Sequence, residues 1–163
     1  MENKVTQTRC GYIGIIGRPN VGKSTLLNAI LGQKLSITCR KPQTTRHQIL
    51  GIKTQGQVQV VYVDTPGMHQ RQEKAINRYM NRAASSILHD VDVLVFLTDG
   101  SWSKEEDWIL ERLKSVECPV ILVINKVDLI KDKAKLLPLI ESLSKKMKFA
   151  EILPISAKQK TQV

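Results

Sequence analysis

The pattern of apolar and polar positions along the chain predicts β-strands that alternate with α-helices. Apolar runs bounded by polar, Gly or Pro residues predict strands at residues 12–16, 49–53, 58–63, 91–98, 120–124 and 151–155. Apolar residues at helical spacing predict helices at 25–31, 70–89, 104–115 and 137–148. Strands rich in Val, Ile and Leu that alternate with helices are typical of a largely parallel sheet covered by helices on both faces.

Two strands depart from the parallel pattern. The predicted strands 49–53 and 58–63 are joined by a short turn at Gln55 and Gly56, so they are expected to pair antiparallel. The sequence therefore predicts an α/β fold with a mostly parallel six-stranded sheet, one antiparallel strand and helices on both faces. Residues 33–46 show only weak periodicity and predict a long loop, which in a compact domain is usually functional.

Local signals refine the predicted helices. Ser103 is a typical N-cap for helix 104–115, and Glu106 three residues later completes a capping box. Pro138 fits helix 137–148 only in its first turn. Opposite its apolar face, helix 70–89 carries a basic stripe of Arg71, Lys74, Arg78 and Arg82. A solvated helix face is the more common meaning of such a stripe, and a surface for a polyanion is the alternative.

Composition and charge bound the class of protein. The chain has 163 residues, which predicts one domain over 1–163. No apolar run is long enough to span a bilayer and residues 1–9 are polar, so a cytoplasmic protein is expected. Three widely spaced cysteines are typical of reduced thiols. The net charge of +10 favours a polyanionic partner such as nucleic acid or an acidic membrane surface, with a Lys-rich solvated surface as the alternative.

A glycine-containing loop lies between the first strand and the first helix and reads G-R-P-N-V-G-K-S. Gly17 and Gly22 allow turns in which successive N–H groups point at an anion, and the helix that follows adds its positive end. Lys23 supplies a charge for the outer phosphates, and the Ser24 hydroxyl is a suitable ligand for Mg²⁺. The residues expected to contact nucleotide here are Gly17, Arg18, Pro19, Asn20, Val21, Gly22, Lys23, Ser24 and Thr25.

Further polar motifs follow predicted strands, where ligands bind in parallel sheets. They are Asp64-Thr65-Pro66-Gly67, Asn125-Lys126-Val127-Asp128 and Ser156-Ala157-Lys158. The Asp128 carboxylate can accept protons from N1 and the 2-amino group of guanine. Asn125 can tie its loop to neighbouring loops or meet N7 of the base, and the Lys126 stem can lie over the ring. A backbone N–H in Ser156-Ala157-Lys158 would suit the guanine O6, so these motifs favour guanine over adenine.

The ordered motifs, together with Thr45 and the segment 42–47, resemble the Era/TrmE type of P-loop GTPase from residue 11 to the end of the chain. The resemblance implies binding of GTP and GDP with Mg²⁺ and slow hydrolysis of GTP as a conformational switch. It implies catalytic roles for Lys23, Thr45 and Gly67. It also implies Mg²⁺ ligation by Ser24, by Thr45 and, through water, by Asp64. Thr44 is the alternative to Thr45.

The resemblance also implies partners. Members act in assembly of the small ribosomal subunit, so 16S rRNA, the 30S subunit, peripheral contact with the inner membrane and a monomeric state are expected. The family's KH-type RNA-binding domain and the terminal helix expected after Lys158 have no counterpart in residues 1–163. The alternative function is a nucleotide-gated binding module or inert fragment without useful turnover.

Two residues bear on the rate of hydrolysis. Many GTPases place Gln directly after Asp-x-x-Gly to orient the attacking water, whereas this chain has Met68, which is at best a weak acceptor. Asn20 resembles the position that related GTPases use to help hold K⁺ against the phosphates. The alternative is that its amide only braces the loop.

Overall fold

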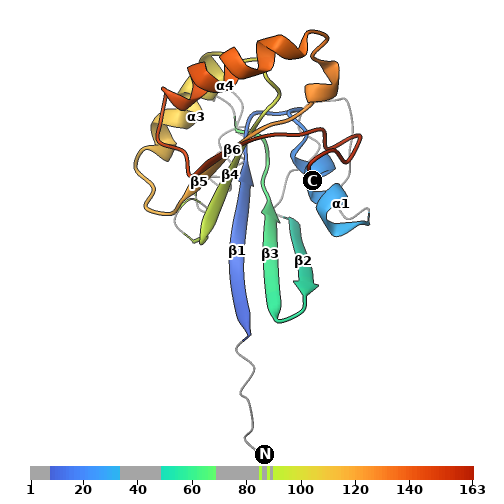
Figure 1. Ribbon diagram of the computed structural model, residues 1–163. Coiled ribbons are helices and arrows are strands. Elements are labelled where there is room, and N and C mark those ends of the chain that lie inside the picture. Colours follow the sequence, from blue (N-terminus) through green and yellow to red (C-terminus); the bar gives the residue numbers. More distant parts are fainter. Residues whose placement is uncertain (1–7, 34–48, 69–84, 86–87, 89) are drawn as a thin grey trace, which may run out of the picture.

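A computed structural model describes residues 8–33, 49–68, 85, 88 and 90–163. In this part of the chain six strands form one sheet in the order β2-β3-β1-β4-β5-β6 (Figure 1). The strands are β1 (Arg9–Ile16), β2 (Ile49–Gln55), β3 (Val58–Asp64), β4 (Val93–Thr98), β5 (Val120–Ile124) and β6 (Glu151–Pro154). The predicted number of strands is confirmed.

The strands pair in the predicted mixture of parallel and antiparallel neighbours. Strand β1 lies in the centre and pairs parallel with β3 and β4, while β4–β5 and β5–β6 are also parallel. Strands β2 and β3 pair antiparallel, with Gln55 opposite Val58 across a turn where Gly56 has φ +59°. The antiparallel pairing that the short turn predicted is confirmed, and the strand order places β2 at the edge of the sheet.

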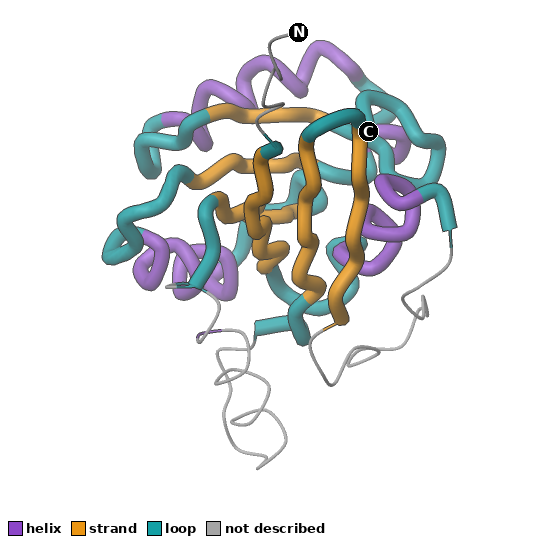
Figure 2. The backbone as a smooth tube through the Cα atoms, turned by 90° about the horizontal axis from the view of Figure 1, so that it is seen from below, coloured by secondary structure: helices purple, strands orange, loops and turns teal. Residues whose placement is uncertain are grey.

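Helices cover both faces of the sheet. They are α1 (Lys23–Leu31), α3 (Lys104–Leu113) and α4 (Leu136–Ser144), with short 3₁₀ turns η1 (Val127–Leu129) and η2 (Lys133–Lys135). Helix α1 lies against one face and α3 and α4 against the other (Figures 1 and 2). Most of the predicted helix 70–89 lies outside the described residues. The predicted loop 33–46 also lies outside them, except for Gln33.

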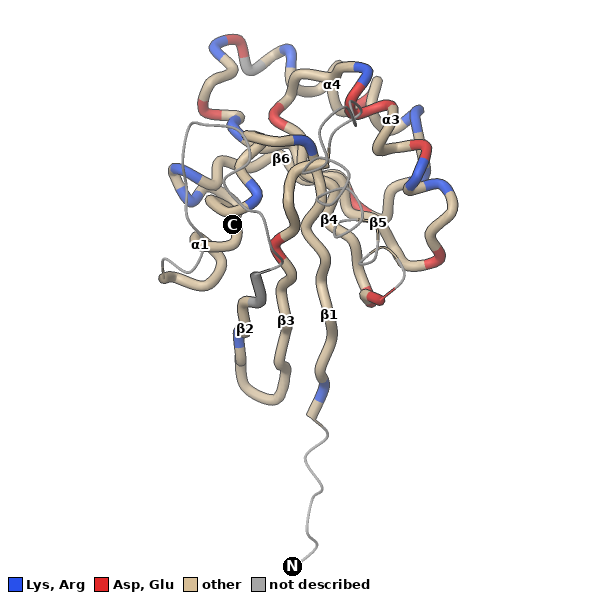
Figure 3. Tube along the Cα trace, turned by 180° about the vertical axis from the view of Figure 1, so that it is seen from behind, with Lys and Arg blue, Asp and Glu red and all other residues tan. Residues whose placement is uncertain are grey.

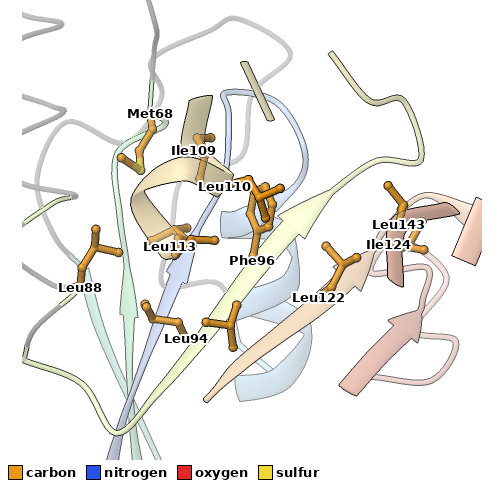
Figure 4. Packing of buried hydrophobic residues seen from close by; sticks show 12 residues of the cluster. Met68, Leu88, Leu94, Phe96, Ile109, Leu110, Leu113, Leu122, Ile124 and Leu143 are labelled. Atoms are coloured by element: carbon orange, nitrogen blue, oxygen red, sulfur yellow. The ribbon is translucent and has the colours of Figure 1, made fainter. Parts of the chain in front are cut away.

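Alternate side chains of β4 enter two separate cores. Leu94 and Phe96 belong to the larger cluster, which includes residues of α3 and Leu143 of α4 (Figure 4). Leu97 belongs to the smaller cluster with Leu26 of α1. A strand buried on both sides must be apolar at successive positions, which explains why the central strands read as continuous hydrophobic runs.

The ends of most elements differ from the prediction by one to four residues, and three of these elements show the local reason. Strand β4 begins two residues later than predicted, because the Asp92 carboxylate accepts a hydrogen bond from the Tyr12 N–H at 2.7 Å in place of a ladder contact. Helix α3 ends at Leu113, where Lys114 and the following residues turn more tightly. Helix α4 covers 136–144 and not 137–148, since the Lys146 N–H bonds back only three residues to Leu143. Pro138 lies in its first turn, as predicted.

A tryptophan closes the seam between α3 and α4. The Trp102 ring packs edge-on against Phe96 with ring centroids 5.9 Å apart, and its indole N–H donates to Asp107 at 2.6 Å. The Lys146 ammonium lies 4.9 Å from the Trp102 ring and 3.1 Å from the same carboxylate. Asp107 of α3 and Lys146, which follows α4, therefore both contact the Trp102 indole.

Candidate nucleotide-binding site

The glycine loop at residues 17–22 joins β1 to α1 at the carboxyl ends of the parallel strands. Its backbone is left-handed at Gly17 (φ +154°), Asn20 (φ +63°) and Gly22 (φ +105°). A Cβ at Gly17 would overlap the Leu97 carbonyl, and one at Gly22 would overlap the Asn125 side chain. The two glycines are therefore required both by conformation and by space.

Lys23 is the first residue of α1, and its side chain lies against this loop. Its side chain is buried, and Nζ donates to the Gly17 carbonyl at 3.1 Å and the Arg18 carbonyl at 3.0 Å. Burial lowers the pKa of Lys23 to about 8, although the Asp64 carboxylate opposes this shift. A buried ammonium that donates to neutral carbonyl oxygens supplies a positive charge for an anion in the loop.

Ser24 and Asp64 provide hard oxygen ligands side by side. The Ser24 hydroxyl donates to Asp64 Oδ2 at 2.7 Å, and Asp64 is fully buried at the end of β3. These oxygens fit Mg²⁺, which is bound in proteins through one or two such groups together with substrate phosphates. In the described parts of the chain there is no group of three or more His, Cys, Asp or Glu side chains that could hold a metal ion.

The segment Asp64-Thr65-Pro66-Gly67 is fixed against the glycine loop. The Thr65 hydroxyl donates to the Ile15 carbonyl at 2.8 Å, and the Met68 N–H donates to the Gly17 carbonyl at 3.1 Å. A Cβ on Gly67 would lie 2.7 Å from Pro19 Cγ, so only glycine fits this approach. Met68 is fully buried in the larger core (Figure 4), so its side chain packs and does not face the site.

Asn125 connects three loops. Its amide Nδ2 donates to the Val21 carbonyl at 2.8 Å, and its Oδ1 accepts from the Ala157 N–H at 2.9 Å. Its own N–H donates to the Thr98 carbonyl at 2.7 Å. Of the two roles that the sequence left open for Asn125, these contacts favour tying the loops together.

Asp128 and the segment 156–158 lie together at the far end of the site. The Ser156 hydroxyl donates to Asp128 Oδ1 at 2.6 Å, and the Gln159 N–H donates to the same hydroxyl at 3.2 Å. Ser156 and Ala157 are buried, Asp128 is half-buried and Lys158 is exposed. The carboxylate is therefore oriented by a neighbour while part of it still reaches solvent.

Four charged side chains join the glycine loop to the rest of the site, and sequence reasoning missed this arrangement. Arg18 pairs with Glu106 and with Asp99, the latter at 2.5 Å, and Lys126 pairs with Asp99 at 3.1 Å. Lys126 also donates to the Asn20 carbonyl at 2.7 Å. The only signal in the sequence was an Asp-Gly pair directly after a buried strand, at Asp99 and Gly100.

The charges in this group reinforce one another. Burial alone raises the pKa of Asp99, but hydrogen bonds from Ser101 and Lys126 and the charge of Arg18 bring it below its usual value. Burial likewise opposes the charge of Arg18, yet Asp99 and Glu106 raise its pKa above the usual range. Two cations and two anions thus balance within the site.

The described site residues agree with the predicted grouping. The glycine loop, Asp64 to Gly67, Asn125 to Asp128 and Ser156 to Lys158 meet at the same edge of the sheet (Figure 1). Val21 and Thr65 point into the protein, so they can serve a nucleotide only through their backbone. Thr45 and the basic stripe of helix 70–89 lie outside the described residues.

Comparison with known proteins places the chain among GTPases. A family model described as "50S ribosome-binding GTPase" matches residues 12–126. GTPase Era of Marinobacter nauticus is 62% identical over 158 residues, which is 96% of this chain and 52% of that protein. GTPase Era of Coxiella burnetii is 61% identical over 156 residues, 96% of this chain and 53% of that protein.

Solved structures agree with this assignment. A crystal structure of Era in complex with MgGDPNP and nucleotides 1506–1542 of 16S ribosomal RNA matches with a TM-score of 0.90 and 39% identity, over 94% of this chain and 53% of that one. A structure of an Aquifex aeolicus Era variant bound to GDP.AlF4⁻ matches with a TM-score of 0.87 and 39% identity, over 93% of this chain and 52% of that one. The chain spans about half the length of these relatives.

Proposed function

Because the chain belongs to the family described as 50S ribosome-binding GTPases, we propose that it binds GTP and GDP with Mg²⁺ and slowly hydrolyses GTP to GDP and phosphate. The observation that carries this proposal is the buried Lys23 ammonium, held by loop carbonyls beside the Ser24–Asp64 pair. A buried cation next to hard oxygens at a helix N-terminus suits a nucleotide polyphosphate.

Each part of the site has a role in this reaction. Lys23 binds the outer phosphates and stabilises the charge that develops on them. Ser24, Asp64 through water, and Thr45 would hold Mg²⁺, which neutralises phosphate charge when bound. The Gly67 N–H would meet the γ-phosphate, so that loss of this phosphate releases the adjoining segments.

The guanine base would occupy the end of the site near Asp128. Its half-buried carboxylate would accept from N1 and the 2-amino group, and a backbone N–H of the adjoining segment Ser156-Ala157-Lys158 would donate to O6. The Lys126 stem would cover the ring, while Asn125 holds the loops in place. This arrangement discriminates against adenine, which has neither the N1 proton and 2-amino group that Asp128 would accept from nor the O6 oxygen.

We also propose partners and a location by similarity. The Era structure bound to 16S rRNA and the charge of +10 support a role in small ribosomal subunit assembly, with 16S rRNA and the 30S subunit as partners. Lys and Arg of the described residues lie mostly on helices and loops (Figure 3). We place the protein, as a monomer, in the cytoplasm with peripheral contact to the inner membrane. Within the described residues no helix has the length and apolarity to cross a bilayer.

Single-turnover phosphate release from bound GTP tests the enzymatic proposal. With Met68 buried, water positioning must come from other groups, so slow release is expected. If Asn20 helps hold K⁺ beside the phosphates, release is faster in K⁺ than in Na⁺ at matched ionic strength, and Asn20→Gly, which keeps the left-handed backbone, removes the difference. Tight GTP binding without phosphate release would favour the alternative, a nucleotide-gated binding module.

A further inference from the structure

The side chain of Arg18 makes contacts that a phosphate-binding loop does not itself require. Its Nε donates to Glu106, and one terminal nitrogen donates to Asp99 at 2.5 Å and to the Ser101 hydroxyl at 2.7 Å. These partners lie at the end of β4 and in the first turn of α3. The guanidinium therefore joins the glycine loop to an element on the opposite face of the sheet.

Glu106 is a fixed anchor for this contact. Its side chain is fully buried, and Oε2 accepts from the Ser103 N–H at 2.9 Å and from the Ser103 hydroxyl at 2.5 Å in a capping box. The other oxygen, Oε1, faces Arg18. A carboxylate that caps a helix cannot shift without breaking the cap, so it determines where Arg18 lies.

Asp99 connects Arg18 to Lys126, which lies at the guanine end of the site. Its Oδ1 accepts from Arg18, and its Oδ2 accepts from Lys126 at 3.1 Å. Lys126 also donates to the carbonyl of Asn20, which belongs to the same loop as Arg18. Arg18, Asp99, Lys126 and Asn20 thus form a closed circuit that is completed by the loop backbone, and Glu106 holds this circuit at Arg18.

We propose that Arg18 is a positioning residue that fixes the guanine-binding loop relative to the phosphate-binding loop by dividing Asp99 between itself and Lys126. Without Arg18, Asp99 Oδ1 loses its cationic partner and keeps the Ser101 hydroxyl as a donor at 2.7 Å, so the carboxylate can turn toward Lys126, which can then leave the Asn20 carbonyl. The guanine-binding loop, Asn125 to Asp128, and the phosphate-binding loop, Gly17 to Gly22, would then no longer be held at a fixed distance from each other. The inference rests on the proposed guanine-nucleotide function.

The test compares nucleotide release with stability in the 163-residue chain. Release of a fluorescent GDP analogue is measured by chase with excess GDP, and unfolding midpoints are measured without nucleotide. Arg18→Ala should speed release by about tenfold, the scale expected for a network contact, and should lower stability by stranding the buried Glu106 charge. Glu111→Gln is the matched control, because Glu111 lies on the same helix and pairs with the exposed Lys114.

The double variant Arg18→Ala, Glu106→Gln separates positioning from a purely structural role. Removing the stranded charge should restore much of the unfolding midpoint, while release stays fast because Asp99 and Lys126 still lack Arg18. Recovery of slow release together with stability would overturn the inference, as would slow release in Arg18→Ala alone. If the unsubstituted chain binds no guanine nucleotide while folded, the proposed function fails and the inference with it.

Discussion

At the scale of single residues, the site depends on charges that are buried and then balanced. Lys23 is enclosed by carbonyls, and Asp99 lies between two cations. Desolvation makes each such charge costly alone, so each is placed where a partner or ligand can compensate it. Two predictions follow from particular side chains.

The first concerns Asp128. Changing Asp128→Asn replaces an acceptor of two hydrogen bonds with an amide that also presents donors to guanine. We expect a loss of about 2–4 kcal/mol in GDP affinity, since charge-assisted bonds are lost and a donor faces a donor. Xanthine nucleotides should gain relative to guanine nucleotides. Calorimetry with GDP and XDP measures both effects, and unchanged GDP binding would contradict the guanine assignment.

The second concerns proton uptake by Lys23. Its pKa of about 8 lies below the usual value because of burial, and nucleotide phosphates should raise it again. Binding should therefore take up protons where the free side chain is partly neutral, about half a proton near pH 8, and affinity should fall as pH rises further. Calorimetry in buffers of different ionisation enthalpy measures the uptake. An uptake that does not increase between pH 7 and pH 8.5 would contradict it.

At the scale of elements, periodicity predicted which segments form strands and helices but not where they end. The motifs predicted most of the site because each follows a buried strand, and parallel strands end at one edge. Strand β4 begins late because Asp92 contacts Tyr12, eighty residues away in sequence. The pair of Arg18 with Glu106 was also missed, because a single sequence does not indicate which distant charges meet.

A prediction at this scale concerns the start of α3. The Ser103 hydroxyl accepts from the Glu105 N–H at 3.2 Å and orients Glu106. Ser103→Ala should therefore cost about 1 kcal/mol of unfolding free energy. For a domain of this size that lowers Tm by roughly 2–4 °C. Ser115→Ala, at the exposed other end of the helix, is the control, and an equal effect of both changes would rule out a capping role.

At the scale of the whole molecule, the two faces of the sheet are unequally covered. Helices α3 and α4 bury the larger core, whereas the α1 face leaves apolar side chains partly in solvent. Leu153 is 43% exposed and Val58 is 44% exposed, and Val95 and Ile121 between them are half-buried. Exposed apolar area of this kind lowers stability and attracts other apolar groups.

We therefore expect the nucleotide-free 163-residue chain to bind a hydrophobic dye such as ANS. Guanine nucleotide should raise its unfolding midpoint, because a ligand that binds only the folded state stabilises it. Leu153→Lys should reduce dye binding. Leu137→Lys is a control, because Leu137 is 75% exposed on α4 on the other face. A cooperative melt well above 60 °C without dye binding would contradict the expectation of a marginal domain.

The indole of Trp102 gives the molecule an internal optical reporter. Its ring lies against Phe96 and under Lys146, and the neighbouring Ser101 hydroxyl accepts from Arg18. An indole beside a cation and a carboxylate changes its emission when either group moves. The second tryptophan, Trp108, is stacked under Arg112 on the same helix and can be replaced by Phe to isolate the signal. Movement at the phosphate end of the site could then be followed as a shift in the fluorescence emission of Trp102, which lies between α3 and α4.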